Sequence, residues 1–184
     1  MRQVLTRELS RAGRTNVLLV PQRAEDGLKD VKGPFDVALA SHALFDVTPI
    51  GMVLVELTKL ADYTYILIGT GDRSDWYRDL RQRFSEEEGP TIPNFGHLYS
   101  VMLEMGIWAD VEILLTSSNY VYDTEEALVT WWMKHLQLGE SRRNELERSL
   151  HQVIEYRGDC IGIYGWHRTA LICIDRSRNL FLSP

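Results

Sequence analysis

Two short apolar runs flank a segment with helical periodicity, and this arrangement constrains the fold more than any other feature of the sequence. The runs are residues 35–44 (FDVALASHAL) and 63–68 (YTYILI). Between them, Thr48 and Pro49 are typical of a helix start, and apolar residues then recur every three or four positions over 50–61. A strand, a helix and a strand in this order form a right-handed βαβ unit. We therefore expect an α/β fold in which 35–44 and 63–68 are neighbours.

Further strands and helices are predicted on both sides of this unit. Residues 16–21 (NVLLVP) form an all-apolar run, which is typical of a strand covered on both faces. Strands are also expected over 111–115, 160–164 and 169–174, with the last two forming a hairpin and 111–115 antiparallel to 169–174. Helices are expected over 1–13, 74–87, 95–105 and 141–156, and Asp123 is expected to cap one that carries Trp131 and Trp132.

Composition narrows the class of protein. The chain has 184 residues, of which 45% are hydrophobic and 25% charged, and this suits a single globular domain over 1–184. A net charge of −6 argues against a dedicated nucleic-acid binder. Two cysteines, Cys160 and Cys173, are too few for a disulfide scaffold and suggest a reducing compartment. No apolar run is long enough for a membrane span, so we expect a cytoplasmic protein.

Several stretches resemble the later part of class I S-adenosylmethionine-dependent methyltransferases. Residues 16–26 (NVLLVPQRAED) look like the third strand of that family with its acidic loop, 33–47 (GPFDVALASHALFDV) like the fourth strand, and 61–72 (ADYTYILIGTGD) like the fifth. The segment from 106 to 176 is similar to the sixth and seventh strands with a helical insertion between them. The resemblance implies a Rossmann-like sheet of order 3-2-1-4-5-7-6, mainly parallel with an antiparallel C-terminal part, and with helices on both faces.

One departure from the family pattern has a direct consequence for the cofactor. The family binds S-adenosylmethionine through a G-x-G-x-G loop after its first strand and an acid after its second, and neither is present. The single G-x-G, at Gly69 and Gly71, follows a later strand. The resemblance therefore implies the C-terminal part of a catalytic domain, which does not bind S-adenosylmethionine when isolated and is inactive alone.

The resemblance also assigns candidate site residues. Glu25 and Asp26 would hold the adenine of the cofactor, although a solvated polar loop is the alternative interpretation. Ser41 and Leu44 would contact the cofactor at the end of the run 35–44, where open α/β sheets bind their ligands. His42 is the candidate general base, with a hydrogen-bonded histidine at a strand end as the alternative.

The methyl acceptor is less constrained by the sequence. The aromatic and histidine side chains considered for an acceptor pocket, with core packing as the alternative for most, are Trp76, Tyr77, His97, Tyr99 and Trp108. The Asn/Asp-Pro-Pro-Tyr signature of nucleic-acid amino methylation is absent, so a small-molecule acceptor is expected. The five histidines show no metal-ligand spacing, and no metal site is predicted.

Without the first two strands of the family, the run 35–44 would form an exposed apolar edge of the sheet. Three solutions remain open: residues 16–21 pair with it, a second copy of the chain covers it, or another polypeptide does. Two functions also remain open. The first is a methyltransferase-family protein, and the alternative is a non-catalytic dimerisation or partner-binding module derived from the same fold. A small-molecule binder unrelated to methyl transfer is a third possibility.

Overall fold

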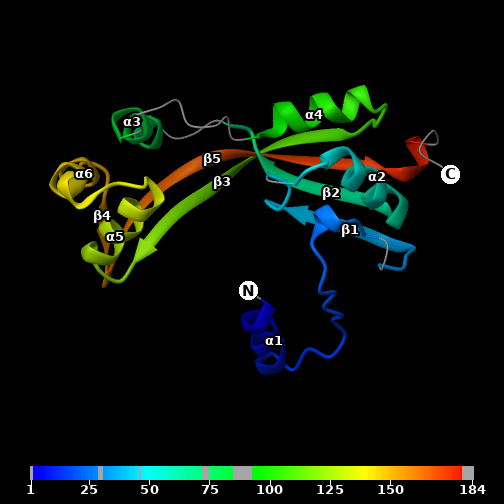
Figure 1. Cartoon of the computed structure of the whole chain (residues 1–184), viewed down its shortest axis with the longest axis horizontal. Helices are drawn as coiled ribbons and strands as arrows, with labels where there is room; N and C mark the ends of the chain where they lie inside the picture. The colour runs from blue at the N-terminus through cyan, green and yellow to red at the C-terminus, as the bar shows by residue number, and fades with distance from the viewer. Residues whose placement is uncertain (1, 29–30, 46, 72–74, 85–92, 180–184) are drawn as a thin grey trace.

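The sheet holds the molecule together and runs through its whole length (Figure 1). A computed structural model describes residues 2–28, 31–45, 47–71, 75–84 and 93–179. The strands are β1 (Phe35–Ser41), β2 (Ala61–Gly69), β3 (Asp110–Tyr122), β4 (Glu155–Arg157) and β5 (Cys160–Asp175). The α-helices are α1 (Arg2–Arg11), α2 (Ile50–Leu60), α3 (Asp75–Phe84), α4 (Phe95–Glu104), α5 (Glu125–His135) and α6 (Arg143–Leu150). Short 3-10 turns are η1 (Ala24–Asp26), η2 (Glu140–Arg142) and η3 (Arg176–Arg178).

The order of the main sheet is β1-β2-β5-β3, and β4 pairs with the far end of β5. β1 and β2 are parallel, whereas β5 is antiparallel to β2, β3 and β4. Four of the five described strands therefore run in one direction and β5 runs against them. This confirms a mixed α/β sheet with a parallel strand pair and an antiparallel C-terminal part. It also confirms that 35–44 neighbours 63–68, and that 111–115 runs antiparallel to 169–174.

The hairpin predicted over 160–174 is wrong, because β5 is one unbroken strand of 16 residues. β3 is also longer than predicted, at 13 residues, and pairs with β5 in constant register from Asp110–Cys173 to Tyr122–Ile161. The residues expected to turn, from Gly165 onward, instead face a partner strand along their whole length. The backbone hydrogen bonds of that ladder outweigh the local preference of a glycine for a turn.

Helices cover both faces of the sheet, as predicted, but at opposite ends of it. α2 and α4 pack on Ile66, Ile172 and their neighbours in one core. α3, α5 and α6 pack on Ile161 and Ile163 in a second core. Because side chains alternate along a strand, the odd-numbered and even-numbered residues of β5 point to opposite faces. The two helical layers therefore lie on opposite faces of β5, and Figure 1 shows them displaced along its length.

The strand predicted over 16–21 is also wrong. Residues 16–21 are mostly exposed and form no ladder, and Leu18 is 87% exposed. An apolar run becomes a strand only where a neighbouring backbone accepts its hydrogen bonds. Residues 16–21 lead away from α1, which lies beyond the edge of the sheet in Figure 1. They form no ladder with β1, whose recorded partner is β2. Within the described residues, the outer edge of β1 has no partner strand.

The helix boundaries differ from the predictions at several termini. Thr48 does not cap α2. The N-cap residue is Pro49, which has an extended backbone conformation and makes no side-chain capping hydrogen bond. α5 is capped by Thr124 rather than Asp123, because the Thr124 hydroxyl accepts a hydrogen bond from the Ala127 amide at 3.1 Å. α6 ends at Leu150, earlier than predicted, because residues 155–157 pair with β5. No helix in the described ranges is long and apolar enough to cross a bilayer.

Replacing Trp132 by alanine should destabilise the protein by about 3–5 kcal/mol, since the side chain is fully buried in the second core. Urea denaturation measures this change. The matched control is Trp108→Ala, at a side chain that is 63% exposed, and it should change stability by less than about 0.5 kcal/mol. Equal losses in the two variants would contradict the assignment of the second core.

Candidate functional site

The carboxyl ends of β1 and β2 meet at one edge of the sheet, because the two strands are parallel. Ser41 and His42 lie there, and both are exposed. The His42 amide donates a hydrogen bond to the Leu67 carbonyl at 2.9 Å, and its ring stacks on Phe45 with centroids 6.0 Å apart. His42 has φ +50°, which is uncommon for a residue other than glycine. The backbone therefore holds this imidazole at the strand end, toward solvent.

The end of β2 is fixed by contacts to two other elements. The Thr70 amide and hydroxyl both donate to the Arg168 carbonyl of β5, at 3.2 and 3.1 Å. Gly71 has φ +85°, and a Cβ there would lie 2.7 Å from Asn94 Nδ2. Asn94 in turn caps α4, where its Oδ1 accepts from the Gly96 amide at 2.9 Å. The glycine is required by this close approach, so the turn 69–71 has a structural role. Asp72, which follows this turn, lies outside the described residues.

Three polar side chains form a hydrogen-bonded cluster where β3 and β5 pass the end of β2. Thr116 Oγ1 lies 3.0 Å from both His167 Nε2 and Thr169 Oγ1, and donates toward the His167 carbonyl at 3.2 Å. Thr169 is fully buried and pairs in register with Gly69, the last residue of β2. Because a hydroxyl carries one proton, Thr116 donates to one of these groups and accepts from another.

This cluster was missed in the sequence, because its members are about 50 positions apart and meet only through the β3–β5 register. The one local signal is the spacing of His167 and Thr169, which places two polar side chains on the same face of a strand. The cluster can exchange a proton or hydrogen-bond a polar ligand, because imidazole and hydroxyl groups both donate and accept.

The aromatic candidates for an acceptor pocket do not gather at this edge. Trp76 and Tyr77 belong to the second core, and Tyr99 packs on the first. His97 caps the start of α4, since its Nδ1 accepts from the Asn94 amide at 3.3 Å. Trp108 is 63% exposed. Most of these side chains therefore pack in a core or stabilise an element, as the alternative interpretation held.

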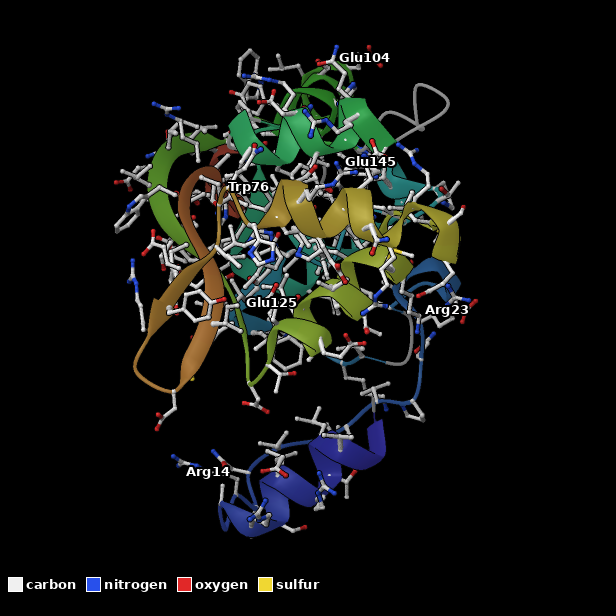
Figure 2. The ribbon with its side chains drawn as sticks, turned by 90° about the vertical axis from the view of Figure 1, so that its left-hand side faces the viewer. Arg14, Arg23, Trp76, Glu104, Glu125 and Glu145 are labelled. Atoms are coloured by element: carbon white, nitrogen blue, oxygen red, sulfur yellow. The ribbon has the colours of Figure 1, made fainter. Side chains whose placement is uncertain are left out.

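A separate groove of about 550 Å³ lies between α3 and the end of α6. Trp76, labelled in Figure 2, lines it together with Arg83 and Ser149. The Arg83 guanidinium donates to the Ser149 hydroxyl at 2.8 Å, so part of its polar wall is already bonded within the protein. Of the predicted site residues, only Trp76 reaches this groove.

The residues predicted to bind the cofactor lie on two segments, η1 and the end of β1. Asp26 is exposed on η1, which is anchored to the middle of α2 because Glu56 accepts from the Leu28 amide. Ser41 lies instead at the end of β1, and Leu44 is only 8% exposed within the first core. The side chain of Glu25 is outside the described part. Asp26 and Ser41 are therefore exposed to solvent, whereas Leu44 packs in the core and offers little surface to a ligand.

Potential metal ligands are also not grouped in the described part of the chain. Among the described residues, no three His, Cys, Asp or Glu side chains are arranged to hold a metal ion. The polar groups at the candidate site are therefore hydroxyl, imidazole and backbone groups.

Comparison with known proteins relates the fold to solved structures only. No protein-family model and no curated protein matches the sequence. The chain is similar to a "putative methyltransferase" of Bacillus halodurans, with 10% identity and a TM-score of 0.53 over 95% of this chain and 78% of that chain. It is also similar to the YcgJ protein of Bacillus subtilis, with 10% identity and a TM-score of 0.49 over 92% and 76% of the two chains. The first similarity shows a methyltransferase-like, Rossmann-like fold.

Substituting Thr116 by valine should cost about 1–3 kcal/mol, because it removes the hydroxyl partner of the buried Thr169. Urea denaturation at neutral pH is the measurement. Thr130→Val is the control, since Thr130 is exposed on α5 and bonds only to Glu126 at 3.3 Å among the contacts described. If Thr116→Val were as mild as this control, the cluster would not contribute to stability.

Proposed function

We propose that this chain is the C-terminal portion of a class I S-adenosylmethionine-dependent methyltransferase domain. The order of its strands carries the proposal. β1, β2, β5 and β3 lie side by side, and β5 alone among them runs in the opposite direction. The family order 3-2-1-4-5-7-6 ends in the same arrangement. β1 corresponds to family strand 4, β2 to strand 5, β5 to strand 7 and β3 to strand 6.

In this proposal, the carboxyl ends of β1 and β2 form the acceptor side of the domain. Ligands of open α/β sheets bind at such ends. His42 is exposed there and accepts the proton that a nucleophilic acceptor releases, while Ser41 contributes a hydroxyl beside it. A small-molecule acceptor suits a chain with a net charge of −6 better than a nucleic acid does. A cytoplasmic location belongs to the same proposal and is supported by two free cysteines.

The isolated chain should not bind S-adenosylmethionine. The cofactor needs polar partners for its carboxylate, amine, ribose and adenine, and this sequence lacks the G-x-G-x-G loop and the acid that supply most of them in the family. Each missing partner costs roughly 1–3 kcal/mol, and each 1.4 kcal/mol is about a tenfold change in affinity. Three or four such losses would weaken a micromolar site by several orders of magnitude.

Isothermal titration of the chain with S-adenosylmethionine, and separately with its demethylated product, should give no binding heat at sub-millimolar ligand. Asp26→Asn serves as a matched variant and should give the same result as the natural chain. Micromolar affinity that is lost in Asp26→Asn would show instead that the chain forms a cofactor site around η1, contrary to this expectation.

The reading frame directly upstream of this sequence tests the assignment to a larger domain. An in-frame G-x-G-x-G loop after a predicted strand is the expected result, since it would supply the missing cofactor segment. A stop codon in frame, with no such loop, would favour the second candidate function.

That function is a non-catalytic partner-binding module. The observation that favours it is the outer edge of β1, which has no partner strand among the described residues.

A further inference from the structure

One face of the sheet carries apolar side chains across β1, β2 and the second half of β5, and we call it the open face. The register pairs Leu39 with Tyr65 and Tyr65 with Cys173, so these residues lie in one row on this face. Its members are Phe35, Val37 and Leu39 of β1, Tyr63, Tyr65 and Leu67 of β2, and Leu171 and Cys173 of β5. α2 and α4 pack on the opposite face.

The open face is exposed to a degree that is unusual for a sheet of this class. Phe35, Val37, Leu39 and Tyr63 are 43–65% exposed. Contiguous apolar patches beyond a few hundred Å² on a soluble protein mark interaction sites. Sheets with parallel strands are normally covered by helices on both faces. The face is therefore expected to be covered by another element.

Leu39, Tyr65 and Cys173 are uncharged, and their row ends at Asp110 of β3, which forms an ion pair with Arg178 at 2.7 Å. The hydrogen bond with Cys173 raises the pKa of the Tyr65 phenol, so the two polar groups of neighbouring strands bond to each other. An apolar helix stripe could cover such a surface without leaving a charge buried and unpaired.

Helix α1 has an apolar stripe of its own that does not contact the sheet. Val4 and Leu5 are 52% and 46% exposed, and Leu9 lies on the same stripe. Figures 1 and 2 both show α1 set apart from the body of the molecule, beyond the edge strand β1. Residues 12–34 connect it to β1 without a further α-helix or strand in their described part. Among the described residues there is thus a helix with an exposed apolar stripe and an apolar sheet face that no helix covers.

The charges of the two parts are complementary. Residues 1–14 contain four arginines and one glutamate, whereas the whole chain has a net charge of −6. The remainder of the chain therefore carries a formal charge of −9. Glu112, exposed on β3, lies on the same side of the sheet as Leu171 of the open face. A basic helix is attracted to an acidic body, and two acidic bodies on their own repel each other.

We propose that helix α1 of a second copy of this chain lies on the open face, in a symmetric dimer that exchanges its N-terminal helices. A ten-residue helix is about 15 Å long and three adjacent strands span about 10 Å, so the sizes match. The exchange explains why α1 extends past the edge of its own sheet. Exchange of one identical element is a common route to dimers. The inference does not depend on methyl transfer and needs no cofactor.

Light scattering after size-exclusion chromatography, at micromolar concentration, is the first test. The natural chain should elute as a dimer. Leu5→Asp on α1 and Leu39→Asp on the open face should each raise the dimer dissociation constant at least about tenfold, because each places a charge in an apolar contact. Leu103→Asp is the control at a leucine of α4 that is 46% exposed, and it should leave the dimer intact. Circular dichroism checks that all three variants fold.

Mixing the two interface variants distinguishes an exchanged helix from other arrangements. In a mixed dimer, the intact helix of the Leu39→Asp chain can lie on the intact face of the Leu5→Asp chain. The mixture should therefore contain more dimer than either variant alone at the same total concentration. A monomeric natural chain would overturn the proposal, as would a dimer that Leu5→Asp leaves unchanged. A dimer that both variants weaken but mixing does not restore would also overturn it.

Discussion

β5 is the structural element on which every other part of this protein depends. It is 16 residues long and pairs with β2 along one half and with β3 along its length. Because side chains alternate along an unbroken strand, Ile172 and Ile163 point to opposite faces and enter two different cores. The two helical layers are therefore displaced from each other. A bulge or turn within β5 would shift one core to the wrong face.

The candidate site follows from the same strand. The residues of β5 that pass the end of β2 bring His167 and Thr169 next to Thr116 of β3, and the Arg168 carbonyl next to Thr70. The parallel pairing of β1 with β2 adds His42 to this edge. None of these contacts is local in sequence. The chemistry available at the edge is consequently that of hydroxyl and imidazole groups held by the strand register.

The displacement of the helical layers also leaves the open face of β1 and β2 uncovered. A complete Rossmann-like sheet has helices over its strands on both sides. Here the first core covers the face of β1 and β2 that carries Ile66. The opposite face of these two strands exposes Val37 and Leu39. Since the described part of the chain leaves one face and one edge of the sheet uncovered, we expect the sheet to acquire a partner, whichever of the two functions applies.

The sequence alone was sufficient for the features that arise within one segment of chain. The βαβ unit around α2 and the amphipathic α4 both follow from local periodicity, because apolar residues at helical or strand spacing must face a core. The apolar run 16–21 has the same local pattern as a strand and yet is exposed. A strand also needs a neighbouring backbone, and that neighbour is decided by the tertiary structure. The long β3–β5 ladder and the Thr116 cluster were decided there as well, since hydrogen bonds between residues about 50 positions apart leave no periodic trace in the sequence.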